Sequence, residues 1–367
     1  MWEGRGVHVD GTIPEDIEAR KRAHIDLCLD AEVSSAVNWW DDVRFVHEPL
    51  PEIDRPNIDT STTLLGRTLR APLLISGMTG GCDSGASINA RLAEAAGIVG
   101  VAMGVGSQRP ALEKPEWEWS YEVVKDKGVP LMLGNVGVPQ LLPQGERPPM
   151  SVEAIGRAME MVGADACCLH LNYLQEAVQP EGDVFAEGAL NIISEVASEY
   201  PVVAKETGAG IPPSAISRLA EAGVSAVDVG GLSGTSWSAV EHHRAVAGGF
   251  TQKAALGELY WNWGIPTPAC VACAPADVPI IATGGLRHGL DLLRAIVLGA
   301  QAGGFARRLL RAADTSVDAV VQELEGIIDE FATGMFLLGA RTLADLSDVE
   351  AMVTGDLASW VDHLGRE

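Results

Sequence analysis

The chain has 367 residues, a formal net charge of −24 at pH 7 and 47% hydrophobic residues. This apolar content supports a large core, but no run of about 18 uncharged apolar residues is present, so we expect no membrane span. The acidity argues against nucleic acid or an anionic membrane surface as a partner. An anionic small-molecule substrate would have to be bound by locally placed cations.

The first 70 residues precede the first predicted strand. Residues 14–29 are predicted to form a helix, because Pro14 lies near its start and the acidic first turn suits the helix dipole. This helix carries Arg20, Lys21 and His24. In isolation its basic pair is more simply explained as a solvated surface.

The N-terminus and the cysteines indicate a cytoplasmic protein. The first ten residues are charged and lack an apolar segment, so no secretory signal is predicted. Cys270 and Cys273 form a single C-x-x-C without a second pair, which falls short of a zinc site. We therefore expect reduced cysteines.

From residue 71 onward, strand, loop and helix patterns alternate. The strands are nearly continuous apolar runs, as in a parallel sheet buried on both faces, and are predicted at 73–77, 98–103, 129–133, 166–169, 202–204, 226–229, 279–282 and 302–305. Helices are predicted at 88–96, 115–127, 152–162, 190–200, 213–222, 290–298 and 317–338. This order predicts the α/β class and a (β/α)8 TIM barrel with an N-terminal helical extension.

The predicted domains follow from this pattern. Residues 1–70 form the N-terminal extension, 71–345 the barrel and 346–367 a C-terminal tail. The sixth and seventh strands are far apart in sequence, so we expect a long insertion at about 237–270, serving as a lid or as an oligomer contact.

Nearly every predicted strand ends in a glycine-rich or polar cluster, as on the active face of such a barrel. Residues 283–289, after the seventh strand, and 304–307, after the eighth, match the barrel's usual phosphate cradle of glycines, a helix N-terminus and an arginine. The alternative is that the glycines only make tight turns. A phosphate here points to flavin mononucleotide (FMN) or to a phosphorylated substrate.

The fourth strand ends in a further polar cluster. His170 and Asn172 face the same way at strand spacing, and Gln175 and Glu176 follow them. One carboxylate beside neutral amides suits a hard cation such as Mg²⁺. On spacing alone, a solvated glutamate is the simpler interpretation.

Lys205 ends an apolar strand, where an unpaired ammonium would be costly. It therefore needs an anionic partner, either Glu206 or a ligand. A flavin-stabilising cation, a Schiff-base lysine and a structural ion pair all remain open. After the sixth strand, Trp237 and Glu241 share one helical face at i, i+4.

Taken together, these motifs resemble the type 2 isopentenyl diphosphate isomerase family, which are FMN-dependent barrels of isoprenoid biosynthesis. The resemblance runs in order from residue 20 to about residue 310. It is carried by Arg20-Lys21-x-x-His24, Met78-Thr79-Gly80-Gly81, Gly106-Ser107-Gln108-Arg109, Gly134-Asn135, His170-Leu171-Asn172, Gln175-Glu176, Lys205-Glu206, Gly234-Thr235-Ser236-Trp237, Gly284-Gly285-Leu286-Arg287 and Ala306-Arg307. Ala23 and Tyr173 depart from it, since many relatives carry Glu and Pro there.

The resemblance implies roles for individual residues. FMN would be held by Met78, Thr79, Gly80, Ser107, Asn135, Lys205 and Thr235, and its phosphate by Gly285, Leu286, Arg287, Ala306 and Arg307. The substrate would be bound by Arg20, Lys21, His24, Ser107, Gln108, Arg109, His170 and Gln175. Catalysis would involve Asn172, Gln175, Trp237 and Glu241, and Glu176 would bind Mg²⁺.

The implied reaction interconverts isopentenyl and dimethylallyl diphosphate by a 1,3-allylic proton shift, with FMN reduced by NADPH. The family also implies a homo-oligomer, a tetramer or octamer. Three alternatives remain: an FMN-dependent 2-hydroxy-acid oxidase, an IMP dehydrogenase-like enzyme with a nucleophilic loop cysteine, and a catalytically silent binding subunit.

Overall fold

The structure, a computed structural model, describes residues 17–366. Within this range eight parallel strands close into one barrel in chain order, with the last strand pairing back to the first. They are β4 (Leu73–Ile75), β5 (Ala102–Gly104), β6 (Met132–Gly137), β7 (Ala166–Leu171), β8 (Val202–Glu206), β9 (Ala226–Asp228), β10 (Ile280–Thr283) and β11 (Ala302–Phe305). The predicted (β/α)8 barrel is therefore confirmed.

Small and branched side chains fill the barrel interior. One cluster of buried residues takes a member from every strand, including Leu74, Leu133 and Ile281. The hairpin of β2 (Thr62–Leu64) and β3 (Arg67–Leu69) adds Leu64 and Leu69 to this cluster. Because the hairpin precedes β4 in the chain, it closes the end of the barrel opposite the carboxyl ends of the strands.

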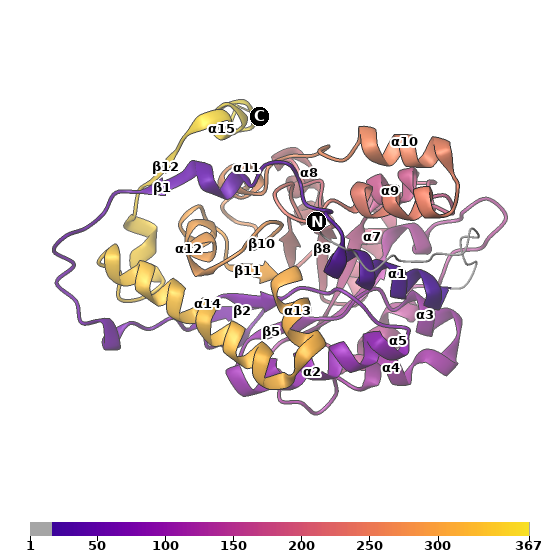
Figure 1. The fold of residues 1–367 in the computed structure, drawn as a ribbon, viewed down its shortest axis with the longest axis horizontal. Coiled ribbons are helices and arrows are strands. Elements are labelled where there is room, and N and C mark those ends of the chain that lie inside the picture. Colours follow the sequence, from indigo (N-terminus) through magenta and orange to yellow (C-terminus); the bar gives the residue numbers. More distant parts are fainter. Residues whose placement is uncertain (1–16, 367) are drawn as a thin grey trace, which may run out of the picture.

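Helices surround the barrel, as Figure 1 shows. They are α2 (Asp83–Val99), α3 (Arg109–Glu113), α4 (Trp119–Glu122), α5 (Glu153–Val162), α6 (Tyr173–Val178), α7 (Ala189–Glu199), α8 (Pro213–Glu221), α12 (Gly289–Val297), α13 (Arg307–Thr315) and α14 (Val317–Leu337). Apolar residues at helical spacing, as in the buried Ile155, Ala158 and Met161 of α5, face the strands. No helix in the described part of the chain has the length and apolar character needed to cross a membrane.

The predicted insertion between β9 and β10 is present. It contains α9 (Trp237–Ala247), α10 (Thr251–Leu259) and α11 (Thr267–Ala272). The first two pack against each other as a helical hairpin. Ser236 caps the N-terminus of α9, because its hydroxyl accepts a hydrogen bond from the Ala239 N–H.

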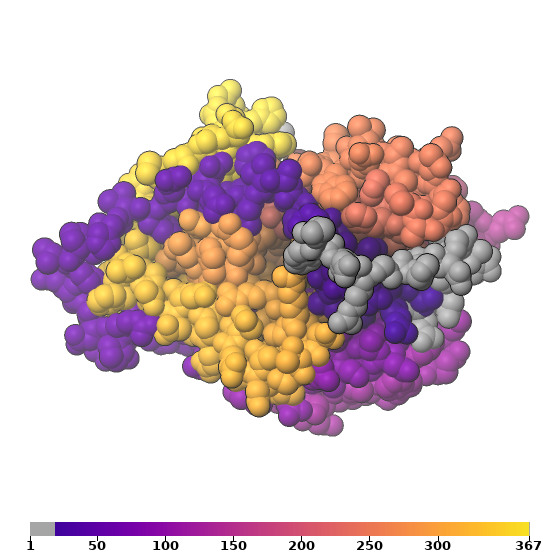
Figure 2. Space-filling model, viewed as in Figure 1, coloured from indigo at the N-terminus to yellow at the C-terminus, as the bar shows by residue number. Residues whose placement is uncertain are grey.

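The N-terminal helix α1 (Ile17–Asp30) lies across the barrel face. It contacts α2, α9 and α13, and Figure 2 shows it (indigo) between the salmon insertion and the purple helices. Arg307, at the start of α13, donates to the carbonyl oxygens of Cys28 and Ala31 and so caps the end of α1. Residues 14–16 of the predicted helix lie outside the described residues.

The segment after α1 leads to a strand that pairs with one near the C-terminus. A short 3-10 turn, η1 (Trp39–Asp42), leads into β1 (Val43–Phe45), which pairs antiparallel with β12 (Ala351–Val353). Helix α15 (Gly355–Leu364) follows β12. A second 3-10 turn, η2, spans Arg55–Asn57.

Several predicted boundaries are wrong, among them the start of the helix predicted at 88–96, which begins at Asp83. Residues 115–127 form the 3-10 turn η3 (Pro115–Trp117) and the short helix α4, not one long helix. The second strand begins only at residue 102, because α2 continues to Val99 and ends at Gly100, which is left-handed at φ 82°. The third strand runs to Gly137 because its glycine and asparagine residues pair with β7.

Truncation of Trp40 tests how firmly the N-terminal segment is attached. This side chain is fully buried and its Nε1 donates to the Gly284 carbonyl at 3.0 Å. We expect Trp40→Ala to lower the free energy of unfolding by about 3–5 kcal/mol, measured by urea denaturation. The control Trp119→Ala, at a half-exposed tryptophan, should cost no more than about 1 kcal/mol. Equal losses of unfolding free energy in the two variants would show that Trp40 does not anchor the N-terminal segment.

Candidate active site

The strand register places a ring of polar and small residues above the apolar core. Side chains two residues apart on a strand face the same side. Two residues beyond the interior cluster, the eight strands carry Ser76, Gly104, Asn135, His170, Lys205, Asp228, Thr283 and Gly304. These residues form the floor of the barrel mouth. Gly304 is needed there, since a Cβ would lie 2.3 Å from Thr283 and 2.5 Å from the Ser76 hydroxyl.

A cavity of about 1130 Å³ opens above this floor. Among the residues predicted from sequence, those that line it are Arg20, Lys21, His24, Met78, Thr79, Ser107, Arg109, Asn135, His170, Asn172, Gln175, Glu176, Lys205, Thr235, Trp237, Gly285, Leu286, Arg287, Ala306 and Arg307. Residues separated by almost 290 positions in sequence therefore share one cavity.

Three predicted site residues do not line the cavity. The Gln108 amide donates to the Ala158 carbonyl at 2.7 Å and accepts from the Asn135 N–H at 2.9 Å, so it supports the loop from behind. Gly80 packs against the Tyr121 ring with no room for a Cβ. Glu241 is fully buried behind the lining.

Glu206, one of the two partners predicted for Lys205, is not its partner in the structure. The Lys205 Nζ donates to Asp228 Oδ2 at 2.7 Å, on the neighbouring strand. Thr283 donates to the other Asp228 oxygen at 2.5 Å. Glu206 was the wrong partner because it follows Lys205 directly and so faces the opposite side of the strand. The Glu206 carboxylate accepts hydrogen bonds from the Thr207 and Gly208 N–H groups. Burial nevertheless raises the pKa of Glu206 to about 7.

Cations gather on one side of the mouth. Arg20, Lys21 and Arg109 all line the cavity. Burial, together with the nearby Arg20, lowers the pKa of Lys21 to about 8. Burial and the charges of Lys21 and Lys205 lower the pKa of His170 to about 3, so this imidazole is neutral near pH 7. Its Nδ1 lies 2.7 Å from Asn135 Oδ1, a hydrogen-bond distance.

A second cluster surrounds Glu241 on α9. One of its oxygens lies 3.0 Å from His24 Nε2 and accepts from Gln175 Nε2 at 2.9 Å, while Arg244 donates to the other oxygen at 2.5 Å. Burial opposes ionisation, but His24 and Arg244 still lower the pKa of Glu241 to about 2. Glu241 is therefore a carboxylate near pH 7. Trp237 packs edge-on against the His24 ring at 5.2 Å.

Glu176 is a buried carboxylate that accepts hydrogen bonds from neutral donors, Gln179 among them. Asn172 donates to its Oε1 at 2.8 Å, and the Asp183 N–H donates to its Oε2 at 2.8 Å. Burial raises the pKa of Glu176. Within residues 17–366, no group of three or more His, Cys, Asp or Glu side chains is placed to hold a metal ion. A cation here would therefore need water and substrate oxygens as its other ligands.

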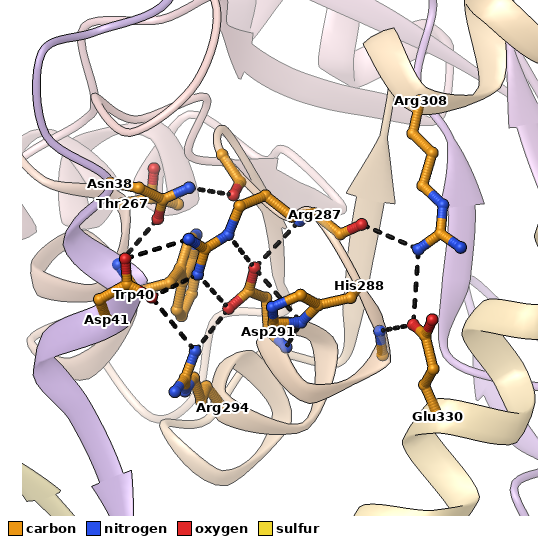
Figure 3. A network of polar contacts seen from close by, with 12 residues as sticks. Asn38, Trp40, Asp41, Thr267, Arg287, His288, Asp291, Arg294, Arg308 and Glu330 are labelled. Atoms are coloured by element: carbon orange, nitrogen blue, oxygen red, sulfur yellow. Dashed lines mark hydrogen bonds and ion pairs between the residues drawn. The ribbon is translucent and has the colours of Figure 1, made fainter.

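The loop after β10 is held by the N-terminal segment, a contact that sequence reasoning missed. Asn38 donates to the Gly285 carbonyl at 2.8 Å, beside the Trp40 contact with Gly284 (Figure 3). Gly284 and Gly285 both have positive φ values. The Arg287 guanidinium binds two carboxylates, Asp41 and Asp291. Apart from the i, i+4 pair of Arg287 and Asp291, these contacts join segments far apart in sequence, so no local pattern marks them.

Two hydroxyls at the barrel mouth lack partners among the described residues. Ser76 Oγ and Thr79 Oγ1 are buried, line the cavity and have no hydrogen-bond partner among the described residues. Buried hydroxyls are normally satisfied. The positive-φ glycines lie at the same mouth, where backbone approaches a ligand closely. These features fit a polar cofactor with a phosphate group.

Comparisons with known proteins agree with this geometry. The family model described as FMN-dependent dehydrogenase matches residues 212–352. Solved structures similar to this chain include a flavocytochrome b2 variant, with TM-score 0.61, 17% identity and coverage of 92% of this chain and 84% of that one. A mandelate oxidase variant with (S)-mandelic acid has TM-score 0.57, 18% identity and coverage of 91% and 94%. Identities this low establish the fold alone.

Sequence relatives are much closer. The isopentenyl-diphosphate delta-isomerase of Thermoplasma volcanium is 43% identical over 346 residues, or 94% of this chain and 99% of the relative. That of Methanococcoides burtonii is 44% identical over 351 residues, or 94% and 95%. That of Archaeoglobus fulgidus is 43% identical over 349 residues, or 94% and 99%. With its cavity built from the motifs of that family, this chain belongs to the type 2, FMN-dependent isopentenyl-diphosphate delta-isomerases.

Proposed function

We propose that this protein interconverts isopentenyl and dimethylallyl diphosphate by a reduced-FMN-assisted 1,3-allylic proton shift. The observation that carries the proposal is a single cavity in which a cationic side adjoins a polar barrel floor. A diphosphate needs the cationic side, and a flavin ring suits the polar floor. The name shared by relatives at 40–44% identity supplies the reaction.

FMN fits the floor and the glycine loop. Its ring would contact residues from five strand ends, and its phosphate would bind the backbone N–H groups at the end of β10 and the start of α13. The proposed ligands are Met78, Thr79, Gly80, Ser107, Asn135, Lys205 and Thr235 for the ring and ribityl chain, and Gly285, Leu286, Arg287, Ala306 and Arg307 for the phosphate. When bound, reduced FMN supplies an electron-rich ring that can exchange a proton and stabilise positive charge. NADPH is the proposed reductant.

The two arginines of the phosphate set act mainly through their backbone. The Arg287 side chain is bound by carboxylates and the Arg307 side chain by α1. The Arg307 N–H begins α13, where helix N-termini attract anions. These side chains therefore attach the N-terminal segment to the phosphate loop.

The cationic side would bind the substrate diphosphate. Arg20, Lys21 and Arg109 supply charge, with Ser107 and His170 beside them and Gln108 supporting the loop. Glu176 would hold Mg²⁺ against the diphosphate through one carboxylate and water, as this ion often binds. A few local cations would thus overcome the repulsion expected from a chain of net charge −24.

The Glu241 cluster would move and hold the proton. Glu241 is ionised and does not reach the cavity, whereas Gln175 lines it and donates to Glu241. His24 and Gln175 therefore connect the carboxylate to the reacting carbons. The Trp237 ring at the cavity wall would stabilise carbocation character by cation–π attraction, and Asn172 would orient Gln175.

A 2-hydroxy-acid oxidase would need a histidine base on the β10 side of the cavity, and no histidine among residues 17–366 lines the cavity there. The histidine on the β10 side, His288, accepts a hydrogen bond from the Asp291 N–H as the cap of α12. It is not among the residues lining the cavity. A capped histidine outside the cavity does not suit abstraction of a substrate proton.

We also propose a homo-oligomer, a tetramer or octamer, in the cytoplasm. Leu256, Leu259 and Trp263 form an exposed stripe along and beyond α10, and exposed apolar patches often mark protein contacts. All six cysteines are free, as expected in a reducing compartment.

The reaction itself is tested by anaerobic incubation with FMN, NADPH, Mg²⁺ and isopentenyl diphosphate in D2O. We expect NMR to show dimethylallyl diphosphate carrying deuterium, because the proton shift exchanges with solvent. Heat-inactivated protein is the control. Consumption of oxygen with a 2-hydroxy acid, and no isomerisation, would instead support the oxidase.

The pH dependence should reveal Lys21. Because its pKa is lowered from 10.5 to about 8, the ammonium loses its proton as the pH rises through that value. We expect kcat/KM to fall above about pH 8, since this quantity reports ionisation of the free enzyme. Lys21→Arg should move the fall to higher pH, because a guanidinium stays protonated. An identical alkaline fall in both proteins would exclude Lys21 as its source.

Replacing Glu241 by Gln tests the proton-transfer cluster. We expect kcat to fall by about 10²–10⁴-fold, the usual contribution of a positioned acid or base. The dissociation constant of FMN should stay within about twofold, because Glu241 does not line the cavity. Normal turnover in the variant would assign the proton step elsewhere.

A further inference from the structure

The loop after α6 places a buried aspartate where three barrel loops meet. Asp183 is only 4% exposed. Arg109, from the loop after β5, donates through Nη1 to Asp183 Oδ2 at 2.9 Å. Gln140, from the loop after β6, donates to the same oxygen at 3.1 Å. Arg147, also after β6, donates to Asp183 Oδ1. One carboxylate therefore joins the loops that follow β5, β6 and β7.

The main chain of the same residue reaches Glu176. The Asp183 N–H donates to Glu176 Oε2 at 2.8 Å. The chain passes very close to α6 just before this point, since a Cβ on Gly182 would lie 1.7 Å from the Glu176 carbonyl oxygen. Any larger residue at 182 would push the loop away. Asp183 thus contacts Arg109 through its side chain and Glu176 through its backbone.

Arg109 is held on two sides. Its Nε donates to Glu113 Oε1 at 2.7 Å, and its Nη1 donates to Asp183. These contacts fix the plane of the guanidinium, and the rest of the side chain lines the cavity. A fixed planar fork suits a phosphate better than a freely rotating one.

The local charges explain why a carboxylate is required. Asp183 accepts from two arginines, of which Arg109 is largely buried. Without the negative charge, the two guanidinium groups would repel each other. Arg147 is half-exposed and could turn to solvent, but Arg109 would lose the contact that orients it.

We propose that Asp183 is a positioning residue that fixes Arg109 and Glu176 in one geometry for binding a magnesium diphosphate. This inference rests on the proposed function, in which the cavity binds a diphosphate. Asp183 does not line the cavity, whereas Arg109, Glu176 and Gln140, which it contacts, do; it acts through the first two.

The test measures binding of inorganic pyrophosphate to the oxidised, FMN-loaded protein by calorimetry, with and without Mg²⁺. No turnover occurs under these conditions. We expect Asp183→Asn to raise the pyrophosphate dissociation constant by about 10- to 100-fold, the usual effect of removing an outer-shell partner. The FMN content should be unchanged.

The matched control is Asp165→Asn. Asp165 also pairs with an arginine, Arg67, and accepts a backbone N–H, from Met132, but it precedes β7 at the opposite end of the barrel. It should lower the thermal midpoint and leave pyrophosphate affinity as in wild type. An equal loss of pyrophosphate affinity in both variants would make the Asp183 effect one of general stability and overturn the inference.

A double-mutant cycle tests the route of action. If Asp183 acts largely through Arg109, Asp183→Asn should have a much smaller effect in an Arg109→Ala background. Full additivity would overturn the inference. Should Asp183→Asn not fold, Arg109→Lys replaces it: the charge remains but the two-sided fork is lost, and wild-type affinity would overturn the inference.

Failure of the proposed diphosphate site and failure of the role of Asp183 give different results. If the wild-type protein binds no pyrophosphate with Mg²⁺, the proposed diphosphate site is wrong, and the role of Asp183 with it. If the wild type binds and Asp183→Asn binds equally well, only the role of Asp183 is wrong.

Discussion

Charge pairing around buried cations is the constraint on which the barrel mouth depends. The cavity must attract a diphosphate in a chain of net charge −24, so its cations have to be local and their own burial has to be compensated. The structure does this by placing carboxylates beside several of the cations. Lys205 pairs with Asp228, and Arg109 pairs with both Asp183 and Glu113. Behind the cavity lining, Arg244 pairs with Glu241 and Glu181.

This pairing also separates the carboxylates from the cations within the mouth. Asp228 and Asp183 do not line the cavity, whereas the cations that they contact, Lys205 and Arg109, do. The substrate would therefore meet a positive surface although its supports are negative. Arg20 shows the same arrangement, since Glu181 lies within 3.5 Å of its guanidinium.

The N-terminal extension lines the cavity as well as covering it. Helix α1 brings Arg20, Lys21 and His24 to the cavity, while Arg307 caps its end. The next residues join the loop before α9, where the Ser236 N–H donates to the Val33 carbonyl. They then reach the loop after β10 through Asn38 and Trp40. The proposed contacts to flavin and to substrate would thus be physically continuous through one segment.

Much of the fold was predictable because its signals are local. Apolar runs ending in polar residues predicted eight strands, and the same ends supply many of the residues that line the cavity. Others come from the N-terminal segment and from α13 and α14. Strand register was less accessible: Asn135 lies inside β6 because it pairs with β7.

Partners across the barrel were not predictable. Sequence left Glu206 or a ligand as the partner of Lys205, yet alternation turns Glu206 away and register brings Asp228 in from the next strand. The Asp183 bridge also depends on three loops meeting in space.

The central claim is that the α1 cations and Arg109 bind a diphosphate above a flavin. A crystal structure with reduced FMN, Mg²⁺ and isopentenyl diphosphate tests it most directly. The account predicts diphosphate oxygens within hydrogen-bond distance of Arg20, Lys21 and Arg109, with the alkene between the flavin and Gln175. A diphosphate bound away from these cations, or on the glycine loop assigned to FMN, would contradict it.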